Sequence, residues 1–188
     1  MVALREEFVE ALASGDVMRF VFIGETSTKL TSCRRYGRAP DGQRLQEAVP
    51  LHNGPNVTLL AALTPKGLGA LLSVNGAVNG DVFAAYLDQV LGPTLQADDV
   101  VVLDNLSVHK VAGLDKIAHK YGARLLYLPP YSPDFNPIEL AFSKLKTWLR
   151  TAQARTRDLL EEAICAAAEW ITEADAKNGF DHCGYHVH

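Results

Sequence analysis

The chain has few cysteines, no long apolar run and no excess of positive charge, and each lack excludes a class of protein. Among its 188 residues, Cys33, Cys165 and Cys183 are too few and too scattered for a disulfide framework. No stretch approaches the ~20 apolar residues that cross a bilayer. The N-terminus has no basic region followed by an apolar one, as a secretion signal would have. We therefore expect a cytoplasmic protein without a membrane role.

The charge balance limits how the chain can contact nucleic acid. Its net charge is -4 and its isoelectric point is near 5.8, which argues against a protein that coats nucleic acid through its overall charge. Any contact with DNA must come from local basic patches. With 48% hydrophobic residues, the chain can bury the core of one domain. Residues 1–16 predict an amphipathic connector helix, and residues 17–188 predict the domain itself.

Two acidic residues occupy positions suited to metal chemistry. Residues 100–103 form a continuous apolar run, typical of a strand buried on both faces, and Asp104 follows directly. Residues 125–128 form a second run, which a proline-rich loop connects to Glu139. Each acid alone has an ordinary explanation: Asp104 caps a turn, and Glu139 is the third residue of a helix capped by Asn136. Together, they can converge on a divalent cation.

The motifs around these acids resemble those of a known enzyme family. Asp104 and Asn105 are followed by His109 and Lys110, and residues 128–139 read LPPYSPDFNPIE. The motifs, with 34 residues between the two acids, resemble the nuclease domain of mariner-like DDE transposases and their bacterial insertion-sequence relatives, which are retroviral-integrase-like. The resemblance covers about residues 17–185. It implies an α/β, ribonuclease H-like three-layer domain with a mixed five-stranded sheet, and the order of the predicted elements favours such a sheet.

The resemblance also implies an activity. Members of this family cleave DNA at transposon ends in a metal-dependent reaction and then transfer the strand to target DNA. Asp104 and Glu139 would be catalytic metal ligands for Mg²⁺ or Mn²⁺, with two ions in an intact site. We expect DNA as the partner, a homodimer on that DNA, no small-molecule substrate, and a bacterial protein associated with the nucleoid when bound to DNA. Related transposases carry DNA-reading helices before this domain, and residues 1–16 leave no room for them.

One family position is altered in this chain. Residues 19–23 predict the first strand, which Gly24, Glu25 and Thr26 are expected to end. The family has its first catalytic Asp where Gly24 stands. Glu25 is not expected to replace that Asp, because successive strand side chains point to opposite faces. We expect impaired catalysis, with one weakly held cation at most.

Several basic residues are candidates for contacts with the DNA backbone. One group lies in the segment 29–44, and another shares a helix side with Glu139. A solvated surface explains the segment 29–44 equally well, and a solvated amphipathic face is the default interpretation of the helix side. The candidates are Arg34, Arg35, Arg38, Lys110, Lys146 and Arg150.

Periodicity and turn signals predict the remaining elements. Further strands are expected at 57–63 and 68–74. Helices are expected over 79–93, from His109 to Lys120, from Pro137 and from about Thr156. The histidines and cysteine in the C-terminal DHCGYHVH are spaced too closely for a structural zinc site.

Two alternative functions stay open. A degenerate transposase could keep the fold and bind DNA or a partner subunit without chemistry, and Gly24 favours this version. A nuclease on the same fold could instead cut RNA or structured DNA. Metal-dependent cleavage of DNA that bears transposon ends would separate the three possibilities.

Overall fold

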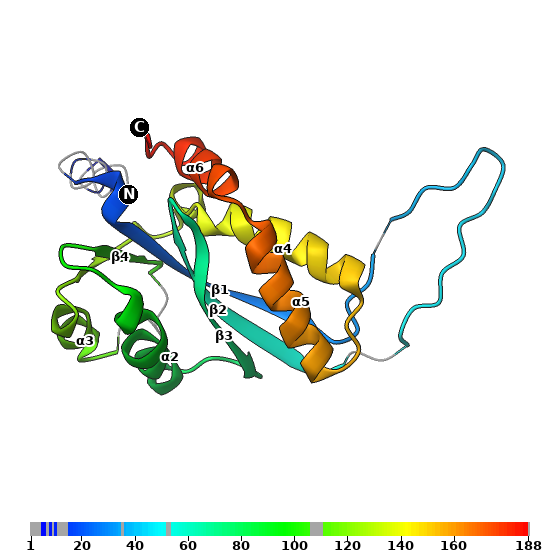
Figure 1. Cartoon of the computed structure of the whole chain (residues 1–188), viewed down its shortest axis with the longest axis horizontal. Coiled ribbons are helices and arrows are strands. Elements are labelled where there is room, and N and C mark those ends of the chain that lie inside the picture. Colours follow the sequence, from blue (N-terminus) through cyan, green and yellow to red (C-terminus); the bar gives the residue numbers. More distant parts are fainter. Residues whose placement is uncertain are drawn as a thin grey trace.

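A five-stranded mixed sheet forms the centre of the molecule (Figure 1). The computed structural model describes residues 5, 6, 8, 10, 15–34, 36–51, 54–105 and 111–187. The strand order is β3-β2-β1-β4-β5, in which β1 pairs antiparallel with β2 and parallel with β4. The predicted α/β fold with a mixed sheet is confirmed. The strands are β1 (Phe20–Lys29), β2 (Asn56–Thr64), β3 (Gly67–Asn75), β4 (Val100–Leu103) and β5 (Arg124–Tyr127).

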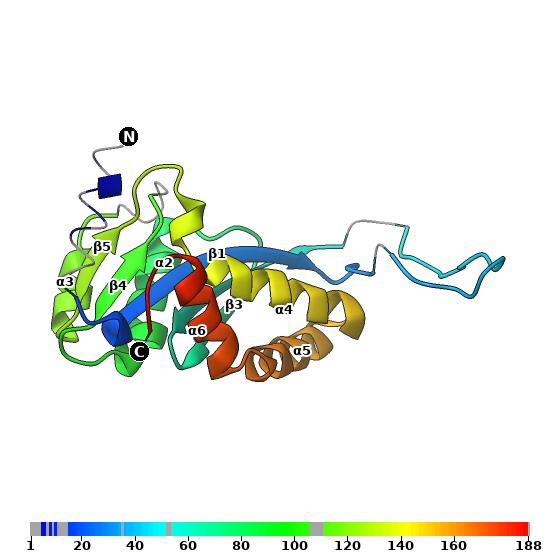
Figure 2. The same ribbon diagram turned by 90° about the horizontal axis from the view of Figure 1, so that it is seen from above.

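Helices cover both faces of the sheet and complete three layers (Figures 1 and 2). One face carries α2 (Gly80–Tyr86), the π-helical turn η2 (Leu87–Leu91), the short η3 (Gly92–Thr94) and α3 (Leu114–Lys120). The other face carries α4 (Ile138–Ala152), α5 (Arg157–Trp170) and α6 (Glu173–His182). The 3-10 turns η1 (Val17–Arg19) and η5 (Pro133–Phe135) lead into β1 and α4. No helix in the described ranges is long and apolar enough to cross a membrane.

The central strands are apolar on both sides because both sides are covered. In β1, Val21 and Ile23 join the core beneath α2, whereas Phe20 and Phe22 join the core beneath α4 and α6. The Phe22 ring lies 5.2 Å from that of Phe180 in α6. All four residues of β4 are buried. This two-sided burial accounts for continuous apolar runs without polar alternation.

The first strand is longer than the sequence predicts. Residues 24–26 do not end it, because β2 pairs with β1 as far as Lys29 and places Gly24 opposite Ala61. Gly24 is thus a buried position within the strand. Because position 24 lies inside the strand, its lack of a side chain affects how the sheet packs against α4. A glycine at the end of the strand would not have this effect.

Two features of the helices also differ from prediction. The helix expected from His109 begins at Leu114, after Gly113 with a φ of 98°; His109 and Lys110 themselves lie outside the described residues. The last predicted helix, from about Thr156, is α5, and α6 after it was not predicted. After α5 ends at Trp170, Thr172 starts α6 with a capping box, in which its side chain and that of Asp175 bond to each other's backbone N–H.

The connection between β1 and β2 projects from the body as a long arm (Figures 1 and 2). Its described residues form no strand, so the basic segment 29–44 is not the strand face that such clusters usually form. Tyr36 and Leu51 are 91% and 95% exposed. At the base of the arm, Nη1 of Arg155 donates to the carbonyl oxygens of Leu30 and Ser32, each at 2.9 Å.

Candidate active site

A cavity of about 470 Å³ lies at the carboxyl end of β4, beneath the proline-rich loop that leads to α4. Ligand sites in sheets with parallel strands commonly occupy this edge. The cavity collects residues from three separate parts of the chain: the end of β4, the loop after β5 and the first turn of α4. Its lining is Asp104, Asn105, Leu128, Pro129, Pro130, Tyr131, Ser132, Pro133, Asn136 and Glu139.

The structure brings Asp104 and Glu139 into this one cavity. Asp104 directly follows β4, and Glu139 is the second residue of α4. Although the Glu139 side chain keeps an exposed surface, partial burial raises the pKa of its carboxyl above the usual value. The positive charge of Lys146 opposes this rise in pKa, and the negative charge of Asp104 adds to it. Asp104 is therefore close enough to Glu139 to raise the pKa of its carboxyl.

Asn136 does not serve as the helix cap that the sequence predicts. The N-cap of α4 is Pro137, no side chain caps the helix, and Asn136 contributes its backbone carbonyl, which accepts from the N–H of Glu139 at 3.2 Å. The Asn136 residue is 5% exposed. Its Oδ1 is buried without a hydrogen-bond partner among the described residues, and the same holds for Oδ1 of Asn105. Both orphaned oxygens belong to residues that line the cavity.

The N-terminal segment contacts the proline-rich loop between β5 and α4. Nη1 of Arg5 donates to Oγ of Ser132 at 2.9 Å, and the guanidinium also bonds both carboxylate oxygens of Asp134. The hydrogen bonds from Arg5 lower the pKa of Asp134. Phe8, which is 5% exposed, stacks on Phe135 with ring centroids 5.6 Å apart. Residues 1–16 were predicted as a connector helix, and residues 5, 6, 8 and 10 are helical.

The C-terminal segment contacts the same loop. Oη of Tyr185 donates to the carbonyl oxygen of Phe135 at 2.6 Å, and Tyr185 is 4% exposed. Burial raises the pKa of this phenol. The contacts of Arg5, Phe8 and Tyr185 with the loop join residues at least 50 positions apart, so the sequence patterns did not indicate them. An aromatic residue near each end of the chain was the one available hint.

Gly24 lies level with Asp104 but is closed off by side chains of α4. The parallel register pairs Phe22 with Val102, and continuing it by two residues places Gly24 opposite Asp104, which directly follows β4. A Cβ added at Gly24 would lie 2.6 Å from Cγ2 of Ile138 and 2.8 Å from Cε2 of Phe142. The strand alternation places Gly24 on the α4 face and Glu25 on the α2 face, as predicted. The described lining of the cavity contains neither residue.

The oxygen atoms around the cavity fit a hard divalent cation. Two carboxylates and two orphaned amide oxygens are the donor types that such ions take. Within the part of the chain that the structure describes, no three His, Cys, Asp or Glu side chains gather to hold a metal. This holds for the described C-terminal residues His182, Cys183 and His186 as well. The cavity therefore offers two acids, one fewer than the family pattern.

The basic candidates fall into a described and an undescribed group. Lys146 and Arg150 lie along α4, about two and three turns beyond Glu139. Nε of Arg34 donates to Oγ1 of Thr151 at 3.3 Å, which brings the base of the arm to the end of α4. Arg38 lies on the arm and is exposed. Arg35 and Lys110 lie outside the described residues.

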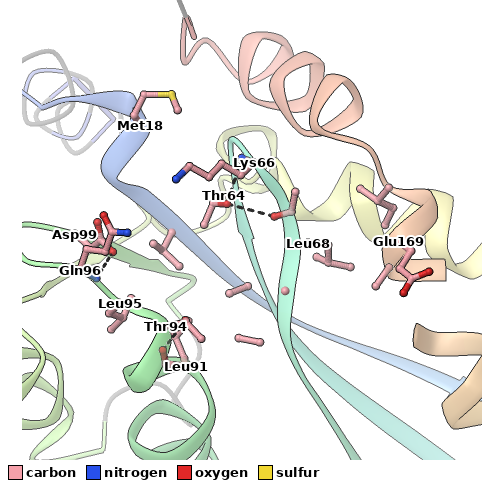
Figure 3. A pocket seen from close by; sticks show the side chains of 17 residues that line it. Met18, Thr64, Lys66, Leu68, Leu91, Thr94, Leu95, Gln96, Asp99 and Glu169 are labelled. Atoms are coloured by element: carbon pink, nitrogen blue, oxygen red, sulfur yellow. Dashed lines mark hydrogen bonds between the residues drawn. The ribbon is translucent and has the colours of Figure 1, made fainter. Parts of the chain in front are cut away.

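A second cavity, of about 490 Å³, lies at the opposite end of the central strands (Figure 3). Its lining includes Asp99, Glu169 and Lys66, but Figure 3 shows the two acids on opposite walls. Asp99 is satisfied by the backbone N–H of Gln96 at 2.8 Å and by Arg19 at 3.6 Å. This cavity therefore lacks a converging pair of carboxylates.

Comparisons with known proteins agree with this geometry. The family model described as DDE superfamily endonuclease matches residues 19–161. The Mos1 mariner paired end complex with Mn has a TM-score of 0.78 at 14% identity, over 97% of this chain and 57% of that chain. The catalytic domain of Mos1 mariner transposase has a TM-score of 0.71 at 12% identity, over 96% of this chain and 86% of that chain. The structure of the Mos1 catalytic domain with Raltegravir and Mg gives 0.72 at 13% identity, over 96% and 86%.

The similarity to these structures confirms the predicted ribonuclease H-like fold. The chain spans just over half the length of the transposase in the paired end complex, at 57%. No curated protein matches the sequence. Since the family model covers most of the domain, from Arg19 to Glu161, the chain belongs to the DDE superfamily endonuclease family.

Proposed function

We propose that this chain is the catalytic domain of a transposase, which cuts DNA at transposon ends and joins them to target DNA, and that Gly24 leaves it impaired. The observation that carries the proposal is the convergence of Asp104 and Glu139 on one cavity at the carboxyl edge of the sheet. The family membership supports the reaction type. The similar solved structures include Mos1 complexes with a transposon end and with Mn or Mg, which supports DNA and a divalent metal as partners.

In this proposal, Asp104 and Glu139 hold Mg²⁺ or Mn²⁺ through their carboxylates. A bound cation would activate the attacking oxygen and stabilise the leaving oxygen of the phosphodiester. Glu139 must be ionised to serve, and the charge of Lys146 favours that form by lowering its pKa. Lys146, Arg150 and Arg34 continue from the cavity toward the arm and would hold the DNA backbone without reading its sequence. Arg35, Arg38 and Lys110 are weaker candidates for the same role.

The wider assignments follow from the same proposal. Residues 17–188 would form the nuclease domain, preceded by a connector in residues 1–16, and the protein would act as a homodimer on DNA in the bacterial cytoplasm. The paired transposon ends in the similar complexes support a dimer.

A degenerate transposase that binds DNA without cutting it is the second candidate. Its supporting observation is that Ile138 and Phe142 occupy the space where a side chain at position 24 would begin. A site kept for catalysis would leave that space open for the first acid. In this version the basic residues along α4 still hold the DNA backbone, but the cavity no longer takes part in cleavage.

Nicking of supercoiled plasmid in Mn²⁺ separates the two candidates. We expect little nicking by the natural chain, clear nicking by Gly24→Asp, and loss of that gain in the double variant Gly24→Asp/Glu139→Gln. Binding of a fluorescent duplex at low and high salt is measured in parallel. Nicking that survives Glu139→Gln contradicts the assignment of this residue. DNA binding without nicking by any variant supports the degenerate version.

A further inference from the structure

The buried amide oxygen of Asn136 makes no hydrogen bond with the described part of the fold. Its Oδ1 neither caps α4 nor accepts any hydrogen bond among the described residues, and the residue is 5% exposed. A buried acceptor without a partner opposes folding by about 1 to 3 kcal/mol. Asn is therefore a costly choice at this position, unless something that binds in the cavity supplies the missing partner.

None of the described side chains that line the cavity with Asn136 donates a hydrogen bond to its amide oxygen. Ionised carboxylates, such as those of Asp104 and Glu139, accept hydrogen bonds and donate none. The hydroxyl of Ser132 already accepts from Arg5 at 2.9 Å and lies 3.4 Å from the carbonyl oxygen of Pro130, to which it donates. Asn105, the next polar neighbour in the lining, has an orphaned oxygen of its own. The cavity thus collects oxygen acceptors, which is the environment that a hard cation satisfies.

We propose that the amide oxygen of Asn136, with that of Asn105, completes the oxygen ligands of a divalent cation held by Asp104 and Glu139. This inference rests on the proposed function and deepens it, because the amides stand in for the acid absent at Gly24. An amide supplies an oxygen ligand without a negative charge. The chain then binds one cation more weakly than a site with three acids, but more tightly than two carboxylates alone would.

The test uses the stability and the Mn²⁺ affinity of the same variants. Asn136→Leu keeps most of the side-chain volume and removes the orphaned acceptor. In EDTA, its Tm is expected to rise by a few degrees, because a buried unsatisfied group is removed. Its Mn²⁺ affinity, measured by electron paramagnetic resonance, is expected to fall about tenfold. Asn136→Asp, which adds a charge to the same position, is expected to bind Mn²⁺ at least about tenfold more tightly.

Two controls locate the effect in the cavity. Asn56→Leu makes the same substitution at an exposed asparagine at the start of β2 and is expected to leave the Mn²⁺ affinity unchanged. Asp104→Asn is expected to abolish the Mn²⁺ binding that the unaltered chain shows. Mn²⁺ binding that survives Asp104→Asn places the ion elsewhere and overturns the inference.

The remaining outcomes separate the inference from the proposed function. If Asn136→Leu keeps the Mn²⁺ affinity, or lowers the Tm in EDTA, Asn136 is a structural residue and the inference is wrong. If Asn136 variants shift Mn²⁺ affinity as expected while Gly24→Asp fails to nick plasmid, the inference stands and the nuclease assignment fails. Cleavage is not needed for either readout of Asn136.

Discussion

The two cavities at opposite ends of the central strands have similar volumes, about 470 and 490 Å³, but differ in how their polar groups are satisfied. At the amino end, Asp99 is paired with Arg19 and with a backbone N–H. At the carboxyl end, two amide oxygens lack partners among the described residues, and partial burial raises the pKa of Glu139. Volume therefore does not distinguish the two cavities.

The difference lies in unsatisfied polar chemistry. A fold normally pairs its buried polar groups, so an unpaired group that lines a cavity can mark where a ligand completes the structure. Oη of Tyr86 also lacks a partner among the described residues, but it lies in the core and lines neither cavity. The carboxyl-end cavity gathers such groups and two acids, while the amino-end cavity satisfies its one buried acid. If this comparison is sound, substitutions at the two ends should separate metal binding from stability.

The largest effect is expected from removing an acid at each end. Asp104→Asn should weaken Mn²⁺ binding by at least ~100-fold, because it removes a charged ligand that few other groups replace. Asp99→Asn should leave the Mn²⁺ affinity unchanged and lower the free energy of unfolding by about 1 to 2 kcal/mol, through loss of its charge-assisted bonds. Titration with Mn²⁺ and urea unfolding measure the two effects. Equal loss of Mn²⁺ binding in both variants would break the comparison.

The next effect concerns Gly24, where an acid can be restored. Gly24→Asp should raise the Mn²⁺ affinity by about 10- to 100-fold, since it adds a carboxylate level with Asp104. In EDTA it should lower the free energy of unfolding by about 1 to 3 kcal/mol, because its Cβ requires Ile138 and Phe142 to move.

A second substitution tests whether that packing is the reason. Ile138→Leu keeps the volume of the side chain and removes the branch at Cβ, whose Cγ2 is the closest atom. In the Gly24→Asp background it should recover part of the stability lost in EDTA. Gly24→Ala is the matched control, which should be destabilised by the same crowding without gaining Mn²⁺ affinity. A stabilised Gly24→Ala would show that the space at position 24 is open.

A smaller effect is expected from the N-terminal contact with the loop. Arg5→Ala should speed amide hydrogen exchange in residues 131–137 about tenfold and weaken Mn²⁺ binding severalfold, because the guanidinium bonds Ser132 and Asp134. Arg5→Lys should restore the charge but not the two-pronged bond. Exchange in β4 should not change. Arg19→Ala, a similarly exposed arginine at the other end of the strands, serves as the control. Unchanged exchange in the loop would show that it is rigid without Arg5.

The smallest effect is the pH dependence that Glu139 contributes. Its pKa is raised in the folded protein, so its ionised form opposes folding. This penalty is absent below the unfolded pKa of ~4.3, develops as the pH rises through the folded pKa, and is complete above it. Metal-free Glu139→Gln should therefore be more stable at neutral pH by less than about 1 kcal/mol, since the group remains partly solvated. At pH 3.5 the difference should vanish. Mn²⁺ affinity should increase with pH over the same window. If Glu139→Gln is still more stable than the unaltered chain at pH 3.5, its gain in stability does not come from the ionisation of Glu139.

Much of the fold was predictable because its signals are local. The continuous apolar run of β4 indicated a strand buried on both faces, and Asn79 caps α2 through a bond from the N–H of Val82 at 2.9 Å, as predicted. The strand alternation of β1 also placed Glu25 away from the cavity. Boundaries were less predictable. Gly24 does not end β1, because pairing with β2 outweighs the poor strand propensity of one glycine.

The sequence by itself determined the strand and helix types, the family and the two acids, since each depends on residues close together in the chain. The tertiary structure alone decided which polar groups are satisfied. Asn136 reads as a helix cap in the sequence, and only the tertiary structure shows that its amide oxygen is buried without a partner among the described residues. In the same way, only the contact of α4 with β1 shows that Ile138 and Phe142 close position 24. Whether a buried polar group has a hydrogen-bond partner, and whether a position has room for a side chain, depends on residues that lie far apart in the chain. No local sequence pattern encodes either property.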